Sequence, residues 1–187
     1  MSALHAMLRF LETQRRQDER EVGHRPTGAA VCEVMDWLIA EVKPVADRTP
    51  VNATPTLSYL QNHAGEAAAT LGFVGEALEE LAGLWQSSED SIHARRQPFI
   101  ALIRRIESER YRVDTETFTT VTDGLDWSTA ETTTDPAVRV QLDAERIART
   151  EQAAVYQQRL QRMDAEIRNY EDRCAQRIRD LARRPRL

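Results

Sequence analysis

The sequence has little of what most catalytic or membrane-bound proteins use. Lys43 is its only lysine among 187 residues, and it stands beside Pro44, which gives little support to lysine-based covalent chemistry. No run of about 18 apolar residues occurs, so no segment is predicted to cross a membrane. Aromatic residues are only 6% of the chain, which favours a narrow core between helices over a broad globular one.

Glycine and proline are also few, with seven of each, so the chain has room for few turns and a small number of long elements. The length suits one domain. The net charge is −5. Proteins that bind nucleic acid usually concentrate positive charge to contact the phosphates, so we expect no nucleic-acid partner.

The first 20 residues, MSALHAMLRFLETQRRQDER, reach charged residues before an adequate apolar core forms. This pattern does not predict a cleavable signal peptide. We therefore expect the protein to be cytoplasmic, or secreted without a cleavable signal peptide.

Periodic apolar residues predict helices along most of the chain. Residues 1–25 predict an amphipathic helix with a charged extension, and residues 28–47 predict a second helix. A proline-bearing linker, DRTPVNATPT, follows at 47–56. A long helix is predicted over 56–110, with a break or kink at 86–98 because Pro98 lacks an N–H group. Its glycines, with neighbouring alanines, predict a smooth face for close helix packing; they are Gly65, Gly72, Gly75 and Gly83.

Residues 111–128, YRVDTETFTTVTDGLDWS, are rich in Thr and Val and do not follow the helical pattern. Two β-branched segments separated by a polar turn predict a small β-hairpin or extended turn. Since two strands alone are marginal in water, this tip must pack on helix ends, and we expect Trp127 and Phe118 to anchor it.

Asp135 and Pro136 are a strong helix start, and the last helix is predicted over 135–184. Its second half carries a nearly heptad apolar row, called here the C-terminal seam: Tyr156, Leu160, Met163, Ile167, Tyr170, Cys174, Ile178 and Leu181. Because a short connection joins two helices of similar length, they should lie antiparallel. The predicted fold class is all-α: an elongated antiparallel helical bundle with a β-like tip, forming one domain over 26–187 after the N-terminal helix.

Chemical sites are poorly supported. Asp90 and His93 have the spacing of two metal ligands on one helix face, but no second such pair exists, so we predict no metal. There is no Gly-x-Ser-x-Gly elbow and no phosphate-binding glycine loop, and we predict no catalytic residue and no cofactor. Cys32 and Cys174 lie on apolar stripes and should be buried, unreactive thiols, with a disulfide between them as the open alternative.

Two surfaces remain as candidates for partner binding. The C-terminal seam either packs on the chain's own helices or pairs with another chain, and its candidate partner-binding residues are Tyr156, Leu160, Met163, Ile167, Tyr170, Ile178 and Leu181. An arginine cluster either contacts an acidic partner or is a solvated face balanced by nearby glutamates: Arg95, Arg96, Arg104, Arg105, Arg110 and Arg112.

The long helices, the arginine-rich composition and the acidic balance resemble actinobacterial helical-hairpin proteins linked to type VII secretion. That family joins two helices through a Trp-x-Gly turn, and WQS at Trp85 or WST at Trp127 stands in its place here, with Ser for Gly. The family's export pattern has an acidic residue four positions after a Tyr, where YEDRC at Tyr170 has Cys174. The resemblance implies helical pairing with a partner and export by a dedicated machine.

The sequence thus predicts a non-enzymatic helical protein–protein interaction module, a secretion-associated substrate or effector-type domain that forms a hetero- or homo-oligomer through a helix face. Two alternatives stay open. One is a structural, self-assembling coiled-coil or scaffold protein, and the other is a small regulator that uses its arginine clusters on an acidic partner.

Overall fold

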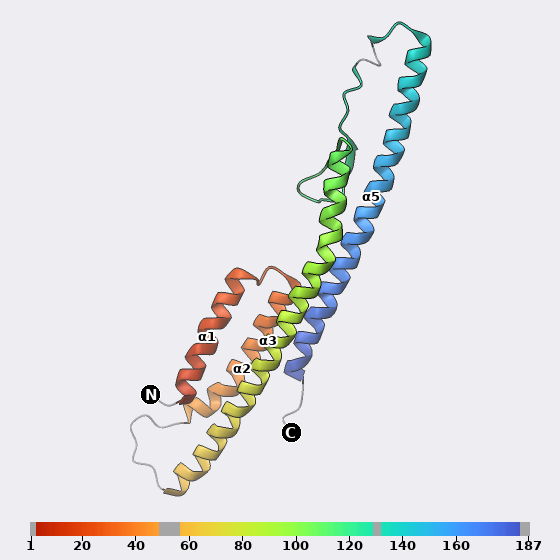
Figure 1. The fold of residues 1–187 in the computed structure, drawn as a ribbon. Helices are drawn as coiled ribbons and strands as arrows, with labels where there is room; N and C mark the ends of the chain where they lie inside the picture. Colours follow the sequence, from red (N-terminus) through yellow and green to blue (C-terminus); the bar gives the residue numbers. More distant parts are fainter. Residues whose placement is uncertain (1–2, 49–56, 129–131, 184–187) are drawn as a thin grey trace. The chain divides into compact units, whose positions relative to one another are not determined.

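The computed structural model describes residues 3–48, 57–128 and 132–183, and most of them are helical. The helices are α1 (Ala3–Glu21), α2 (Pro26–Asp47), α3 (Leu57–Ser108) and α5 (Pro136–Arg179), and a 3-10 turn, η1 (Asp180–Arg183), follows α5. Between α3 and α5, β1 (Tyr111–Val113) and β2 (Val121–Asp123) form an antiparallel hairpin (Figure 1). The prediction of an all-α fold with a small β-hairpin is confirmed. Most of the predicted linker at 47–56 lies outside the described residues.

The chain divides into two compact units, where the sequence predicts one bundle domain over 26–187. Unit 1 comprises Met1–Asp90 and Tyr170–Leu187, and unit 2 comprises Ser91–Asn169. Both α3 and α5 therefore contribute residues to each unit. The apolar side chains form two separate cores, one in each unit.

Unit 1 is built around α2. Its apolar residues recur every three or four positions, so they form one stripe that is buried along its length. Leu4 and Leu11 of α1 pack on this stripe, and the remainder of the core comes from α3, α5 and η1: Val74, Leu81, Ala175, Ile178 and Leu181. Burial of these side chains is the main stabilising contribution in unit 1.

Close packing between α1 and α2 depends on Gly28. A Cβ added at this position would lie 1.9 Å from the carbonyl oxygen of Val22, in the turn that joins the two helices. Arg15 of α1 then pairs with Asp36 of α2, through Nε to Oδ1 at 2.8 Å and Nη2 to Oδ2 at 3.2 Å. A residue without a side chain thus lets the chain turn tightly enough for α1 to lie along α2.

Unit 2 contains the last part of α3, the hairpin and the first part of α5, with the two helices antiparallel (Figure 1). Leu102 and Ile106 of α3 share a core with Ala153, Tyr156 and Leu160 of α5. Tyr111 and Val121 close this core from the hairpin. They lie on the strands at positions whose side chains face the helices, as the buried-then-exposed pattern of both strands shows.

The helix α3 continues without interruption through residues 86–98, so the predicted break is absent. Pro98 removes one backbone donor, which leaves the carbonyl of Ala94 without its intrahelical partner. Apolar residues follow directly at Phe99 and Leu102 and pack in the core of unit 2. The packing of α3 beyond Pro98 therefore outweighs the loss of one hydrogen bond.

Candidate interaction surface

The structure places the C-terminal seam inside the two units. Tyr156, Leu160 and Met163 belong to the core of unit 2, and Ile178 and Leu181 belong to the core of unit 1. Ile167 is buried and Tyr170 is half-buried. Packing within the chain thus occupies most of this seam, and its use by a partner stays a prediction.

The hairpin is tied to α5 by one arginine. Arg149 Nε donates to Asp123 Oδ1 at 2.8 Å, and its Nη2 donates to the carbonyl oxygens of Glu109 and Arg110, both at 3.2 Å. Its guanidinium also lies over the ring of Tyr111, 4.2 Å from the centroid. Arg149 therefore satisfies the carbonyls at the end of α3 and carries a charge-assisted bond to β2.

The carboxylate of Asp123 accepts hydrogen bonds from three residues. Besides Arg149, it accepts from the backbone N–H of Leu125 at 3.1 Å and from Trp127 Nε1 at 2.8 Å. Desolvation raises the pKa of Asp123, but the bonds from Arg149, Leu125 and Trp127 together outweigh it and hold the pKa below its ordinary value. The carboxylate is thus kept ionised in a half-buried position.

A second bridge joins the end of α3 to α5. The Tyr156 hydroxyl donates to Glu109 Oε2, and Arg105 Nε donates to Glu109 Oε1 at 3.0 Å. The hydrogen bond from Tyr156, followed by that from Arg105, lowers the pKa of Glu109. The same bond and burial raise the pKa of Tyr156. These contacts fix the antiparallel register of α3 and α5 within unit 2.

The loop between the strands is closed by Asp114, and it presents Phe118. Asp114 Oδ2 accepts from the backbone N–H and the hydroxyl of Thr117, both at 2.7 Å. Phe118 has φ 54° and is 47% exposed, so the prediction that it anchors the tip is wrong. Tyr111 and Val121 are buried there, because the strand register turns these two side chains toward the helices. Trp127, the other predicted anchor, is half-buried and bonds Asp123.

The most apolar exposed surface lies on α5. Val140, Ile147 and Val155 are 70%, 59% and 56% exposed. With the exposed alanines between them they form a row that we call the outer face of α5: Val140, Ala144, Ile147, Ala154 and Val155. At 3.6 residues per turn this row is on the opposite side of the helix from Ala153, Tyr156 and Leu160, which pack on α3. The sequence pattern alone does not reveal this row because alanines interrupt the large apolar residues.

The glycines of α3 also face open space. A Cβ added at Gly65, Gly72 or Gly83 would meet no atom within 4 Å, and the same holds for Gly75. The smooth face predicted for close helix packing is therefore uncovered within the described residues. The side chains that α3 buries in unit 1, including Val74 and Leu81, lie on its other side.

The side chains with catalytic or metal-binding potential are dispersed. Among the residues described, no group of three or more His, Cys, Asp and Glu is arranged to hold a metal ion. Asp90 is exposed, and His93 contacts Gln97 at 3.0 Å between the ring Nε2 and the amide nitrogen. Cys32 and Cys174 are buried free thiols, as predicted, and desolvation raises the pKa of Cys32. A thiol in this state is a weak nucleophile.

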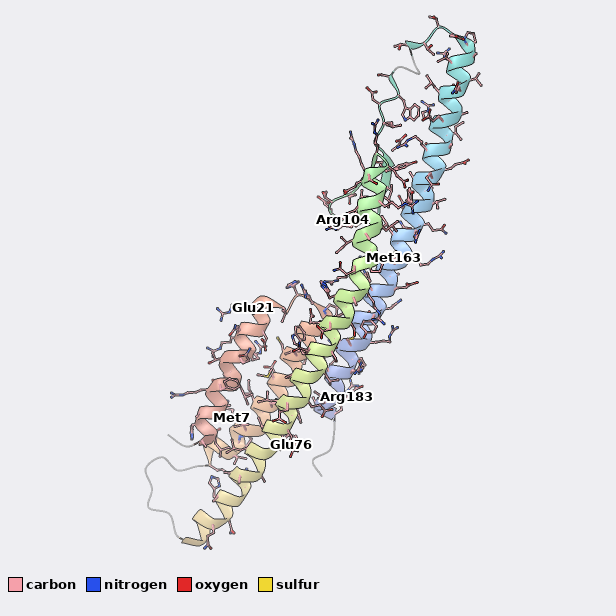
Figure 2. The ribbon with its side chains drawn as sticks, in the orientation of Figure 1. Met7, Glu21, Glu76, Arg104, Met163 and Arg183 are labelled. Atoms are coloured by element: carbon pink, nitrogen blue, oxygen red, sulfur yellow. The ribbon has the colours of Figure 1, made fainter. Side chains whose placement is uncertain are left out.

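The arginine cluster is spread over α3 and the start of the hairpin. Arg105 pairs with Glu109, and Arg104, Arg110 and Arg112 are exposed. Arg110 has φ 64°, and its backbone ends the helix while its carbonyl accepts from Gly124 N–H at 3.0 Å. Figure 2 labels Arg104 of this cluster on α3. Part of the cluster is thus engaged in holding the tip of unit 2.

No helix in the described part of the chain has the length and apolar character needed to span a membrane. No family model, curated protein or solved structure matches the chain. Of the two tryptophans that resemble the type VII turn, Trp85 lies inside α3 and Trp127 follows β2.

Proposed function

We propose that the protein is a non-enzymatic interaction module whose outer face of α5 packs against a helix of a partner protein. The observation that carries this proposal is the exposure of Val140, Ile147 and Val155 on one face of one helix. Single exposed apolar residues are common on soluble proteins, but several gathered on one face of one helix are a feature of binding surfaces.

The spacing of the outer face supports a helical partner. Val140, Ala144, Ile147, Glu151 and Ala154 are separated by four, three, four and three residues, which is the spacing of a coiled-coil seam. Alanines at two of these positions let a second helix approach closely. Covering the three large side chains contributes roughly 1 kcal/mol each, so the contact should be reversible unless a partner covers more of the unit.

A variant of the outer face tests this proposal. Val140→Asp combined with Ile147→Asp places two charges in the row without touching the core of unit 2. Ile100→Asp is the matched control, because Ile100 is an exposed apolar residue of α3 in the same unit. In a pull-down from the native cell, the double variant should lose a partner that the control retains. Capture of the same proteins by both variants contradicts the proposal.

Self-assembly is the second candidate, and the open glycines of α3 favour it. A face of Gly65, Gly72, Gly75 and Gly83 lets the backbone of another helix come close, as in tightly packed helix pairs. Light scattering of the purified chain at several concentrations separates the two functions. A mass that rises with concentration, and that Gly72→Leu returns to the monomer value, supports self-assembly through α3.

The association with type VII secretion is a narrower proposal that rests on the sequence resemblance alone. Its test is export of the tagged chain from an actinobacterial host with and without an active type VII machine. Machine-dependent appearance in the medium supports the association, and equal amounts in both hosts contradict it.

A further inference from the structure

Unit 1 contains a groove that its own core does not fill. The groove has a volume of about 320 Å³, and residues of α1, α2 and α3 line it. Leu78 and Trp85 of α3 are half-buried and provide an apolar surface, with the buried Met35 and Leu81 beneath them, while Asp18 and Glu21 of α1 line the other side. Figure 2 shows Glu21 at the end of α1. The groove is thus apolar on one side and acidic on the other.

The two carboxylates of the groove differ from several acidic residues of unit 1 that pair with arginines. Asp36 pairs with Arg15, Glu33 with Arg179 and Glu66 with Arg48. Within the described residues, Asp18 and Glu21 receive hydrogen bonds only from the amides of Gln14 and Gln17, at 3.1 and 2.9 Å. Their negative charge is therefore not neutralised by an arginine of unit 1.

A third carboxylate of unit 1 lies outside the residues that line the groove. Glu89 lies one helical turn beyond Trp85 on α3, and its Oε2 accepts from Arg25 Nη1 at 3.3 Å. Its other oxygen, Oε1, is buried and has no hydrogen-bond partner in the described structure. Glu89 thus adds a negative charge on α3 one helical turn from Trp85, and Arg25 offsets it at 3.3 Å.

We propose that this groove binds an amphipathic helix of another protein, one that carries a bulky apolar side chain between arginines or lysines. The apolar side chain lies against Leu78 and Trp85, and the basic side chains pair with Asp18 and Glu21. The volume holds a large side chain and part of its neighbours, and helix-in-groove binding uses this combination of apolar anchor and charged rim.

A second copy of this chain is a poorer occupant. Its most apolar exposed helix surface is the outer face of α5, and Glu151 lies within that row. A glutamate brought beside Asp18 and Glu21 would be repelled, whereas a lysine or arginine would be attracted. The proposal concerns unit 1 only, so it stands or fails independently of the outer face of α5.

The experiment is a selection of helical peptides from a displayed random library on the whole chain. The selection is repeated on Ala82→Phe, which fills the groove from an exposed alanine of α3 that lines it. Ala69→Phe is the matched control, since Ala69 is an exposed alanine of the same helix that does not line the groove. We expect peptides with apolar residues at helical spacing and flanking Arg or Lys, binding Ala82→Phe at least ten-fold more weakly than the control.

The contribution of the acidic side of the groove is tested by binding of the same peptides to charge variants. Asp18→Asn with Glu21→Gln should weaken their binding about ten-fold and reduce its dependence on salt, while Glu76→Gln with Glu79→Gln on the exposed side of α3 should change it less than two-fold. Folding of each variant is checked by circular dichroism and thermal unfolding.

Three outcomes overturn the proposal. They are peptides that bind Ala82→Phe as well as the unchanged chain, a selection that enriches acidic or no peptides, and a groove-dependent dimer of the chain itself.

Discussion

The guanidinium of Arg149 lies 4.2 Å from the centre of the Tyr111 ring while its Nε bonds Asp123 at 2.8 Å. One side chain of α5 thus contacts both strands of the hairpin. Since a two-stranded hairpin is marginal by itself in water, its order depends on this contact and on the shared core beneath it.

Replacing Arg149 should loosen the hairpin. Arg149→Ala leaves Asp123 ionised and partly buried without its partner, and we expect a loss of about 3 kcal/mol in the free energy of unfolding of unit 2. Hydrogen exchange at the amides of 111–123 is the measurement, because it reports this region separately. Arg146→Ala, at an exposed position one turn earlier, should leave these amides as protected as before.

Acid should destabilise unit 2 through Asp123 and Glu109. Both have folded-state pKa values below their ordinary values of 3.8 and 4.5. Their contribution to stability is therefore fully present above those ordinary values and is lost as the pH falls through the lowered folded-state values. Denaturation curves from pH 7 to pH 2 should show stability falling below about pH 4.5. Asp123→Asn should be less stable at pH 7 and lose less on acidification; an unchanged pH slope contradicts this account.

Replacing glycine with alanine should destabilise the protein at Gly28 and stabilise it at Gly72. Gly28→Ala places a Cβ 1.9 Å from the backbone oxygen of Val22, so the α1–α2 turn must shift, at a cost of about 2–3 kcal/mol. Gly72→Ala meets open space inside a helix and should stabilise the chain by about 0.5–1 kcal/mol. Thermal unfolding of the two variants beside the unchanged chain checks both signs.

Substitutions on the buried and exposed faces of α5 should differ strongly in their effect on the free energy of unfolding. Leu160 is fully buried, and Leu160→Ala should cost about 3 kcal/mol through lost burial and the cavity that remains. Val155→Ala, on the outer face, should change the free energy of unfolding by less than about 0.5 kcal/mol. Urea denaturation measures both; equal losses would show that the outer face is also packed in solution.

Much of the fold follows from local sequence patterns. Asp135 and Pro136 predict the start of α5, and in the structure α5 begins at Pro136 while Asp135 Oδ1 accepts from Ala137 N–H at 2.9 Å. The strands lie within the predicted segment 111–128. These features depend on neighbouring residues, so a single sequence carries the information for them.

Features that depend on distant contacts were harder to predict. Pro98 disfavours a helix locally, yet packing of Leu102 and Ile106 holds α3 together across it. Phe118 has the apolar character of an anchor, but the strand register decides which residues face the helices. The spacing of the C-terminal seam identifies a buried face without showing which helices cover it, and it gives no sign of the second apolar row on the opposite side of α5.

The division of the chain has a consequence for its synthesis. The closing piece of unit 1, beginning at Tyr170, leaves the ribosome only after the whole of Ser91–Asn169 has been translated. At about 5–20 residues per second this is a delay of several seconds. During that time the part of the unit 1 core that Ile178 and Leu181 complete is still open, so we expect the nascent chain to expose apolar surface that the finished protein buries.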